Sequence, residues 1–172
     1  SPLQAPDTYL DRVGAAVTDP KRRIYAAMVI AQDDAIGRIM EALGALKLEE
    51  NTLVCFISDN GGPVGERSNG SSNGTLRAGK GTVYEGGIRV PFVLRWKGAL
   101  PGGTDYTQPV ISLDLARTAL AVAGGKEAEG RPMDGVNLIP FLKGGDSAAP
   151  HDALFWRHGG GASFAVRSGS MK

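Results

Sequence analysis

The residues best suited to chemistry stand in segment 58–62, which reads SDNGG. Asp59 supplies a carboxylate and Asn60 an amide oxygen, and these hard oxygen donors are ligands that Ca²⁺ and Mg²⁺ prefer. Two glycines after them would let the chain turn sharply and leave an ion accessible. The same residues also make an ordinary turn, and two ligands do not fill a Ca²⁺ shell of about six to eight oxygens. The segment indicates either part of a metal site or a simple turn.

A second candidate is segment 76–82, which reads LRAGKGT. Lys80 stands between two glycines, so its side chain is sterically free to reach an anion with help from neighbouring backbone N–H groups. We reject a nucleotide phosphate loop, because no predicted strand leads into this segment. The alternative to anion binding is a solvated lysine on a flexible loop.

For the other reactive side chains we expect structural or surface roles, not catalytic ones. Cys55 lies within an apolar segment and is expected to be a small buried hydrophobe, not a nucleophile. His151 and His158 show neither HxH nor HExxH spacing, which favours surface or structural roles. Asn69 and Asn73 begin glycosylation sequons, but such matches are frequent by chance in a Ser/Asn/Gly loop.

The elements that must position these segments follow an α/β pattern. Asp19 before Pro20 is a good helix start, and apolar residues recurring every three or four positions predict a helix to about Leu46. Residues 52–58 are apolar without alternation, which predicts a central strand buried on both faces, as in a parallel sheet. Segment 58–62 then stands at the carboxyl end of that strand, where ligands bind in open α/β sheets.

The rest of the chain predicts shorter elements. Residues 61–82 form a Gly/Ser/Asn-rich loop, and a loop of this length is usually functional or disordered. Further along we expect a strand near 88–96, helices at 112–123 and 137–142, and short strands at 154–156 and 164–166.

Composition excludes some classes of function. The 172 residues carry 19 Lys and Arg against 18 Asp and Glu, a net charge of +1, which argues against nucleic-acid binding through a large basic field. No apolar run approaches the length of a membrane span. One cysteine excludes an internal disulfide framework.

Taken in chain order, the motifs resemble those of the type I sulfatases, in the alkaline phosphatase superfamily. The resemblance covers nearly the whole chain and rests on an ordered set of segments, no one of them decisive. The set includes PLQAP at 2–6, DDAIGR at 33–38, SDNGG at 58–62, LRAGKGT at 76–82 and EGGIRVP at 85–91. It implies part of an α/β sandwich over residues 1–125, followed by the start of a smaller C-terminal α+β subdomain over 126–172.

The resemblance also implies roles for four residues. Asp59 and Asn60 match two metal ligands of the family, usually for Ca²⁺, with Mg²⁺ as an alternative. Lys80 matches the catalytic lysine that contacts the sulfate group, and Arg77 is expected to line the same substrate-binding site. A cation and an ammonium group there would stabilise charge on the transferring sulfuryl oxygens.

Departures from the family pattern qualify these roles. The family nucleophile is a formylglycine made within a C/S-x-P/A-x-R motif, and this chain has no such motif. Two further acidic ligands and a histidine that precedes PLQAP in the family are also missing, so we expect a C-terminal portion of a sulfatase. This chain alone is expected to be inactive and to bind Ca²⁺ only at about millimolar concentration or weaker.

The parent activity implied by the resemblance is sulfate-ester hydrolysis. The alternatives are a phosphatase or phosphonate hydrolase of the same superfamily, or a non-catalytic structural remnant. A partial sheet would expose its edges, so association with a second copy is expected. The resemblance is compatible with a periplasmic or secreted location.

Overall fold

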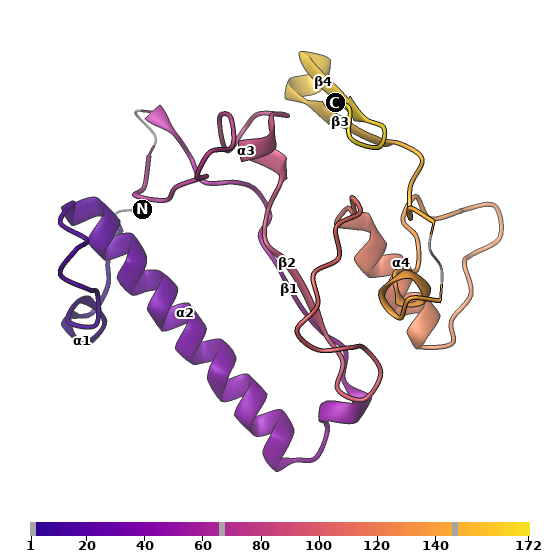
Figure 1. The fold of residues 1–172 in the computed structure, drawn as a ribbon, viewed down its shortest axis with the longest axis horizontal. Coiled ribbons are helices and arrows are strands. Elements are labelled where there is room, and N and C mark those ends of the chain that lie inside the picture. The colour runs from indigo at the N-terminus through magenta and orange to yellow at the C-terminus, as the bar shows by residue number, and fades with distance from the viewer. Residues whose placement is uncertain (1–2, 66–67, 146–147) are drawn as a thin grey trace. The chain divides into compact units, whose positions relative to one another are not determined.

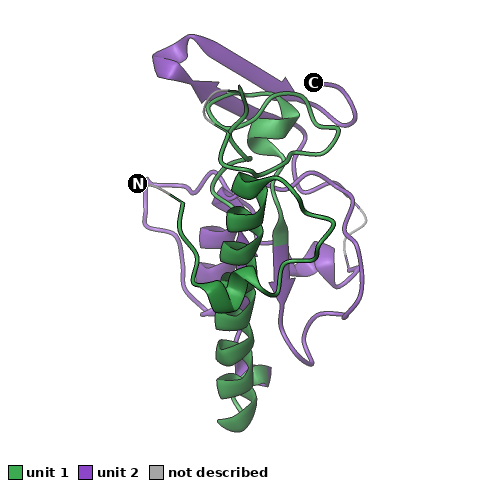
Figure 2. Ribbon diagram, turned by 90° about the vertical axis from the view of Figure 1, so that its left-hand side faces the viewer, with its two compact units in different colours: residues 1–49, 58–92 green, residues 50–57, 93–172 purple. Residues whose placement is uncertain are grey.

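The computed structural model describes residues 3–65, 68–145 and 148–172 (Figure 1). The chain divides into two compact units, one made of residues 1–49 and 58–92 and the other of 50–57 and 93–172 (Figure 2). The domain boundary near residue 125 stays a prediction. The elements in chain order are α1 (Asp7–Leu10), α2 (Pro20–Ala45), η1 (Glu49–Asn51), β1 (Val54–Ile57), α3 (Glu85–Ile88), β2 (Phe92–Arg95), α4 (Leu113–Val122), α5 (Ile139–Leu142), β3 (Leu154–His158), η3 (Gly159–Gly161) and β4 (Ser163–Arg167).

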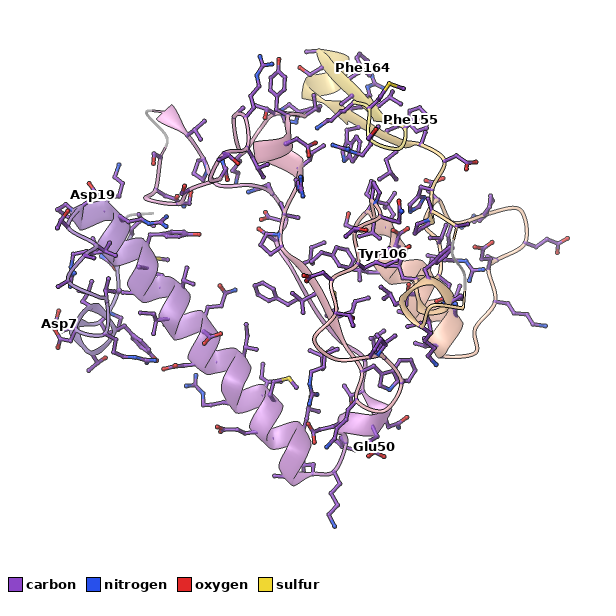
Figure 3. The ribbon with its side chains drawn as sticks, viewed as in Figure 1. Asp7, Asp19, Glu50, Tyr106, Phe155 and Phe164 are labelled. Carbon is purple, nitrogen blue, oxygen red and sulfur yellow. The ribbon has the colours of Figure 1, made fainter. Side chains whose placement is uncertain are left out.

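Helix α2 begins where the sequence predicts. The Asp19 side chain accepts a hydrogen bond from Arg22 N at 2.7 Å, which satisfies one of the backbone donors left unpaired in the first helical turn (Figure 3). Pro20 is the first helical residue, where its missing N–H costs nothing. The cap is local chemistry, so the sequence alone predicts it.

A surface ion pair joins the segment after α1 to α2. The Arg12 guanidinium donates to Asp34 Oδ2 at 2.5 Å and to Oδ1 at 2.9 Å. This hydrogen bond lowers the pKa of Asp34 below its usual range. The folded chain therefore favours the charged carboxylate, and the contribution to stability is present above the ordinary carboxyl pKa of about 3.9.

We expect that contribution to be lost as the pH falls through the lowered pKa of Asp34. Asp34→Asn should destabilise the protein slightly at pH 7, because both partners are solvent-exposed enough for screening to weaken the pair. The difference from wild type should shrink in acid. Urea unfolding at pH 7 and below pH 3 tests this, with Asp33→Asn as control. An equal difference at both pH values contradicts the prediction.

The surroundings of strand β1 differ from those predicted. It pairs with β2. Ser58 N donates to Pro91 O and Trp96 Nε1 to Glu50 O, so the end of β1 meets the start of β2 and the two strands run antiparallel. Among the described residues β2 is the only strand beside it, and Phe56 is 36% exposed, so the expectation of a strand covered on both faces in a parallel sheet is wrong for this chain. Association through these edges stays a prediction.

Cys55 is likewise exposed, not buried as the sequence suggests. The strand is only partly covered: Val54 and Ile57 are half-buried, while Cys55 and Phe56 between them are exposed. Partial desolvation by neighbouring groups still raises the pKa of its thiol. A raised pKa lowers the thiolate fraction at neutral pH, which disfavours a nucleophilic role.

The C-terminal elements follow the predicted order. The two predicted strands form an antiparallel hairpin in which Phe155 lies opposite Val166 and Arg157 opposite Phe164. Phe155 and Phe164 are exposed on this hairpin (Figure 3). One difference lies upstream: of the predicted strand near 88–96, only Phe92–Arg95 is strand, and Ile88 belongs to the helical turn α3. Within the described ranges, no helix combines the length and hydropathy needed to cross a bilayer.

A buried polar cluster ties α4 to the residues after it. Asp114 is fully buried, and its two carboxylate oxygens accept from Ile111 N at 2.8 Å and Val136 N at 2.9 Å. His151 Nε2 lies 3.0 Å from both oxygens. Next to it, the hydroxyl of the buried Thr118 accepts from Leu138 N at 3.0 Å. His151 therefore has a structural position, bonded to the carboxylate that organises this turn.

We expect Asp114→Ala to be strongly destabilising. The change leaves two backbone N–H groups and the His151 ring without their acceptor in a dry environment. The free energy of unfolding of the whole protein should fall by about 3 to 5 kcal/mol, measured by urea denaturation. Asp152→Ala, at an exposed neighbour of His151, is the control and should cost little. A loss below about 1 kcal/mol for Asp114→Ala contradicts this view of the cluster.

Candidate functional site

The turn at 58–62 presents oxygen donors just after β1. Asp59 is exposed and its Oδ1 accepts from Asn60 N at 3.0 Å. Asn60 is half-buried, and its Nδ2 donates to Gly61 O at 3.0 Å. This bond fixes the amide, so Oδ1 of Asn60 is left as an acceptor without a partner among the described residues. Both side chains are therefore able to offer oxygen atoms to a cation.

The lysine turn lies directly against this oxygen-donor turn. Lys80 N donates to Gly62 O at 3.1 Å, and Thr82 Oγ1 closes the lysine turn by donating to Gly79 O at 2.8 Å. Gly79 is buried between the two turns. The structure thus places the turn that carries the predicted metal ligands beside the turn that carries the predicted sulfate lysine.

The Asn73 side chain forms three hydrogen bonds to the backbone of these two turns. Its Oδ1 accepts from Gly62 N at 2.8 Å, and its Nδ2 donates to Gly62 O and to Ala78 O, both at 2.9 Å. The sequence analysis treated this residue only as a chance sequon. Its role depends on contacts across the loop, so no local sequence signal identifies it.

Close backbone approach explains the glycines around the site. Gly61 N donates to Gly87 O at 3.0 Å, and Gly86 N donates to Arg77 O at 2.8 Å. A Cβ placed on Gly61 would overlap the carbonyl oxygen of Gly86, and one on Gly79 would overlap that of Gly62. These positions need glycine because three chain segments meet without room for side chains.

The site carries two cationic side chains, Arg77 and Lys80. The Arg77 guanidinium stacks over the Tyr84 ring at 3.8 Å from its centroid. Arg77 and Lys80 are both exposed, and neither forms an ion pair within the described part of the chain. Two cations that are not neutralised by the protein suit an anionic ligand.

The donor set fits part of a Ca²⁺ or Mg²⁺ site. Asp59 and Asn60 offer one charged and one neutral oxygen, which is the chemistry such ions prefer. The described ranges contain no group of three or more His, Cys, Asp or Glu side chains that would hold a metal. Asp59 and Asn60 could provide two ligands, and a Ca²⁺ shell of about six to eight oxygens needs further ones.

Comparison with known proteins gives consistent matches. A model of the sulfatase family matches residues 1–125. Steryl-sulfatase of Mus musculus is 39% identical over 137 residues, covering 76% of this chain and 22% of that protein. N-acetylgalactosamine-6-sulfatase of Canis lupus familiaris is 35% identical over 153 residues, covering 88% and 29%.

The solved structures agree with these matches. Ps i-CgsB in complex with k-i-k-neocarrahexaose has a TM-score of 0.89 and 36% identity, over 98% of this chain and 37% of that one. The likeness confirms the predicted fold class, part of an alkaline-phosphatase-like α/β sandwich. The chain thus spans 22% of the length of the mouse relative and 37% of this structural neighbour.

Proposed function

The chain belongs to the sulfatase family, and from this premise we propose that the whole protein hydrolyses sulfate esters at the site described above. Lys80 and Arg77 bind the sulfate group, and Asp59 and Asn60 hold a divalent cation, Ca²⁺ or Mg²⁺. The observation that carries the proposal is the 3.1 Å bond from Lys80 N to Gly62 O, which ties the lysine turn to the oxygen-donor turn.

The chemistry needs positive charge where these residues lie. Hydrolysis breaks the bond between the ester oxygen and sulfur and yields an alcohol and inorganic sulfate, while negative charge builds on the departing oxygen. The Lys80 ammonium and the Arg77 guanidinium stabilise the negative charge of the sulfuryl oxygens, and a bound cation would add Lewis-acid stabilisation. Tyr84 restricts the Arg77 guanidinium through the stacking contact, which lowers the entropy cost of binding an anion. In this proposal the formylglycine nucleophile comes from a part of the protein outside these 172 residues.

We also propose a saccharide sulfate as the substrate class. The support is the match to Ps i-CgsB, a structure in complex with an oligosaccharide, which extends over 98% of this chain. Among the sequence matches, that to N-acetylgalactosamine-6-sulfatase covers 88% of this chain and that to steryl-sulfatase 76%. Sulfated oligosaccharides and steryl sulfates assayed side by side distinguish the two classes.

The proposed reaction is tested with the whole protein and three 4-nitrophenyl substrates. We expect hydrolysis of the sulfate ester with a kcat/KM at least about 100-fold above those for the phosphate monoester and the phenylphosphonate ester, a preference of about 3 kcal/mol. A preference for phosphate or phosphonate supports the alternative hydrolases of the same superfamily. No turnover of any ester supports a non-catalytic protein.

A further inference from the structure

We propose that Asn73 is a positioning residue that holds the oxygen-donor turn and the lysine turn in register. The inference rests on the proposed function, because it concerns the same site. Asn73 itself need not touch substrate or metal. It acts through Gly62, two residues after Asn60, and through Ala78, two residues before Lys80.

Its amide group matches the backbone atoms around it. Gly62 N needs an acceptor, while Gly62 O and Ala78 O need donors, and one amide side chain supplies one acceptor and two donors. All three distances lie between 2.8 and 2.9 Å. Aspartate would keep the acceptor but place negative charge against two carbonyl oxygens. Asparagine is therefore the side chain that satisfies all three groups.

The bond to Ala78 holds a backbone conformation that is otherwise unfavourable. Ala78 has φ +61°, in the left-handed region that residues with a Cβ adopt rarely. Asn73 Nδ2 fixes its carbonyl group, and Lys80 N bonds Gly62 O beside the second Nδ2 bond. Without the amide, the chain from Ala78 to Lys80 is free to relax and carry the lysine away from the turn that bears Asp59 and Asn60.

The same hydrogen bonds bear on whether the sequon at Asn73 is glycosylated. Glycosylation modifies Nδ2, and that nitrogen donates both of its hydrogens to backbone carbonyls. Attachment of a glycan would remove at least one of these bonds. We therefore expect Asn73 to serve as a hydrogen-bonding side chain and not as a glycosylation site.

The test uses the whole protein with Asn73→Ala and Asn73→Asp, and Asn69→Ala as the matched control. Asn69 begins the neighbouring sequon, and its Oδ1 accepts from Ser71 N at 3.0 Å, within its own turn. Calorimetry gives the Kd for Ca²⁺ and for inorganic sulfate, and steady-state kinetics give the sulfate Ki. We expect both Asn73 variants to raise the Kd of each ligand about 10- to 100-fold, because residues that orient the binding groups without touching the ligand commonly have an effect of this size. The control should change neither Kd by more than about two-fold.

A merely structural role gives a different result. It lowers the thermal midpoint and the folded fraction but leaves both Kd values of the folded protein unchanged, and that outcome overturns the proposal. If Asn73→Ala fails to fold, the measurements are repeated in an Ala78→Gly background, since glycine relieves the left-handed strain at residue 78. Absent sulfatase activity in wild type overturns the proposed function alone, because the two Kd values still test Asn73.

Discussion

Replacing Lys80 by alanine in the whole protein should lower kcat/KM for a sulfate ester by about 100- to 1,000-fold. The Lys80 side chain has no ion-pair partner among the described residues, so its charge is available to the substrate. Losing one preorganised group that stabilises transition-state charge typically has an effect of this size. Steady-state kinetics with 4-nitrophenyl sulfate measure it.

Two variants accompany this measurement. Lys80→Arg keeps the charge but changes its geometry and should recover part of the loss. Lys126→Ala removes an exposed lysine of the other compact unit and should leave kcat/KM unchanged. A Lys80→Ala enzyme that retains more than about a third of wild-type kcat/KM contradicts the role given to this residue, because a transition-state contact of this kind is worth far more.

Replacing Asp59 by alanine should weaken Ca²⁺ binding to the whole protein by on the order of 100-fold. Asp59 contributes a full negative charge, and the affinity of oxygen-ligand sites depends on the number of charged ligands. Calorimetry measures the Kd directly. Activity should fall with it and recover in part when Ca²⁺ is raised, because the missing ligand weakens occupancy.

The response to added Ca²⁺ distinguishes the metal-binding role of Asp59 from the sulfate-binding role of Lys80. The Lys80→Ala enzyme should not respond to extra Ca²⁺, since its defect lies in the charge that faces sulfate. Asp105→Asn, an exposed acidic residue far along the chain, serves as control for the change of net charge. Unchanged Ca²⁺ affinity in Asp59→Ala would assign the metal to other residues.

Local chemistry made part of this structure predictable. The Asp19 cap and the helix it begins follow from neighbouring residues, as do the order of the later helices and the C-terminal strands. The candidate residues Asp59, Asn60 and Lys80 were identified from their types, their glycine neighbours and the resemblance to sulfatases. Their proximity, through the bond from Lys80 N to Gly62 O, was not predictable from spacing alone.

The features that escaped prediction depend on distant contacts. The direction of β1 against β2 is set by pairing across a long loop, and the exposure of Cys55 depends on what covers the strand. The bonds of Asn73 reach residues 11 and 5 positions away, so neither periodicity nor propensity reveals them. The role of a polar side chain in a glycine-rich loop can be recognised only when the position of the surrounding backbone is known.

A crystal structure of the whole protein with Ca²⁺ and inorganic sulfate tests the central claim most directly. We expect Asp59 and Asn60 Oδ1 at about 2.3 to 2.6 Å from the cation. Lys80 Nζ should lie within about 2.7 to 3.2 Å of a sulfate oxygen, with Asn73 still bonded to Gly62 and Ala78. A cation bound without Asp59 and Asn60, or a sulfate ion bound away from Lys80, contradicts the assignment of these two turns to one site.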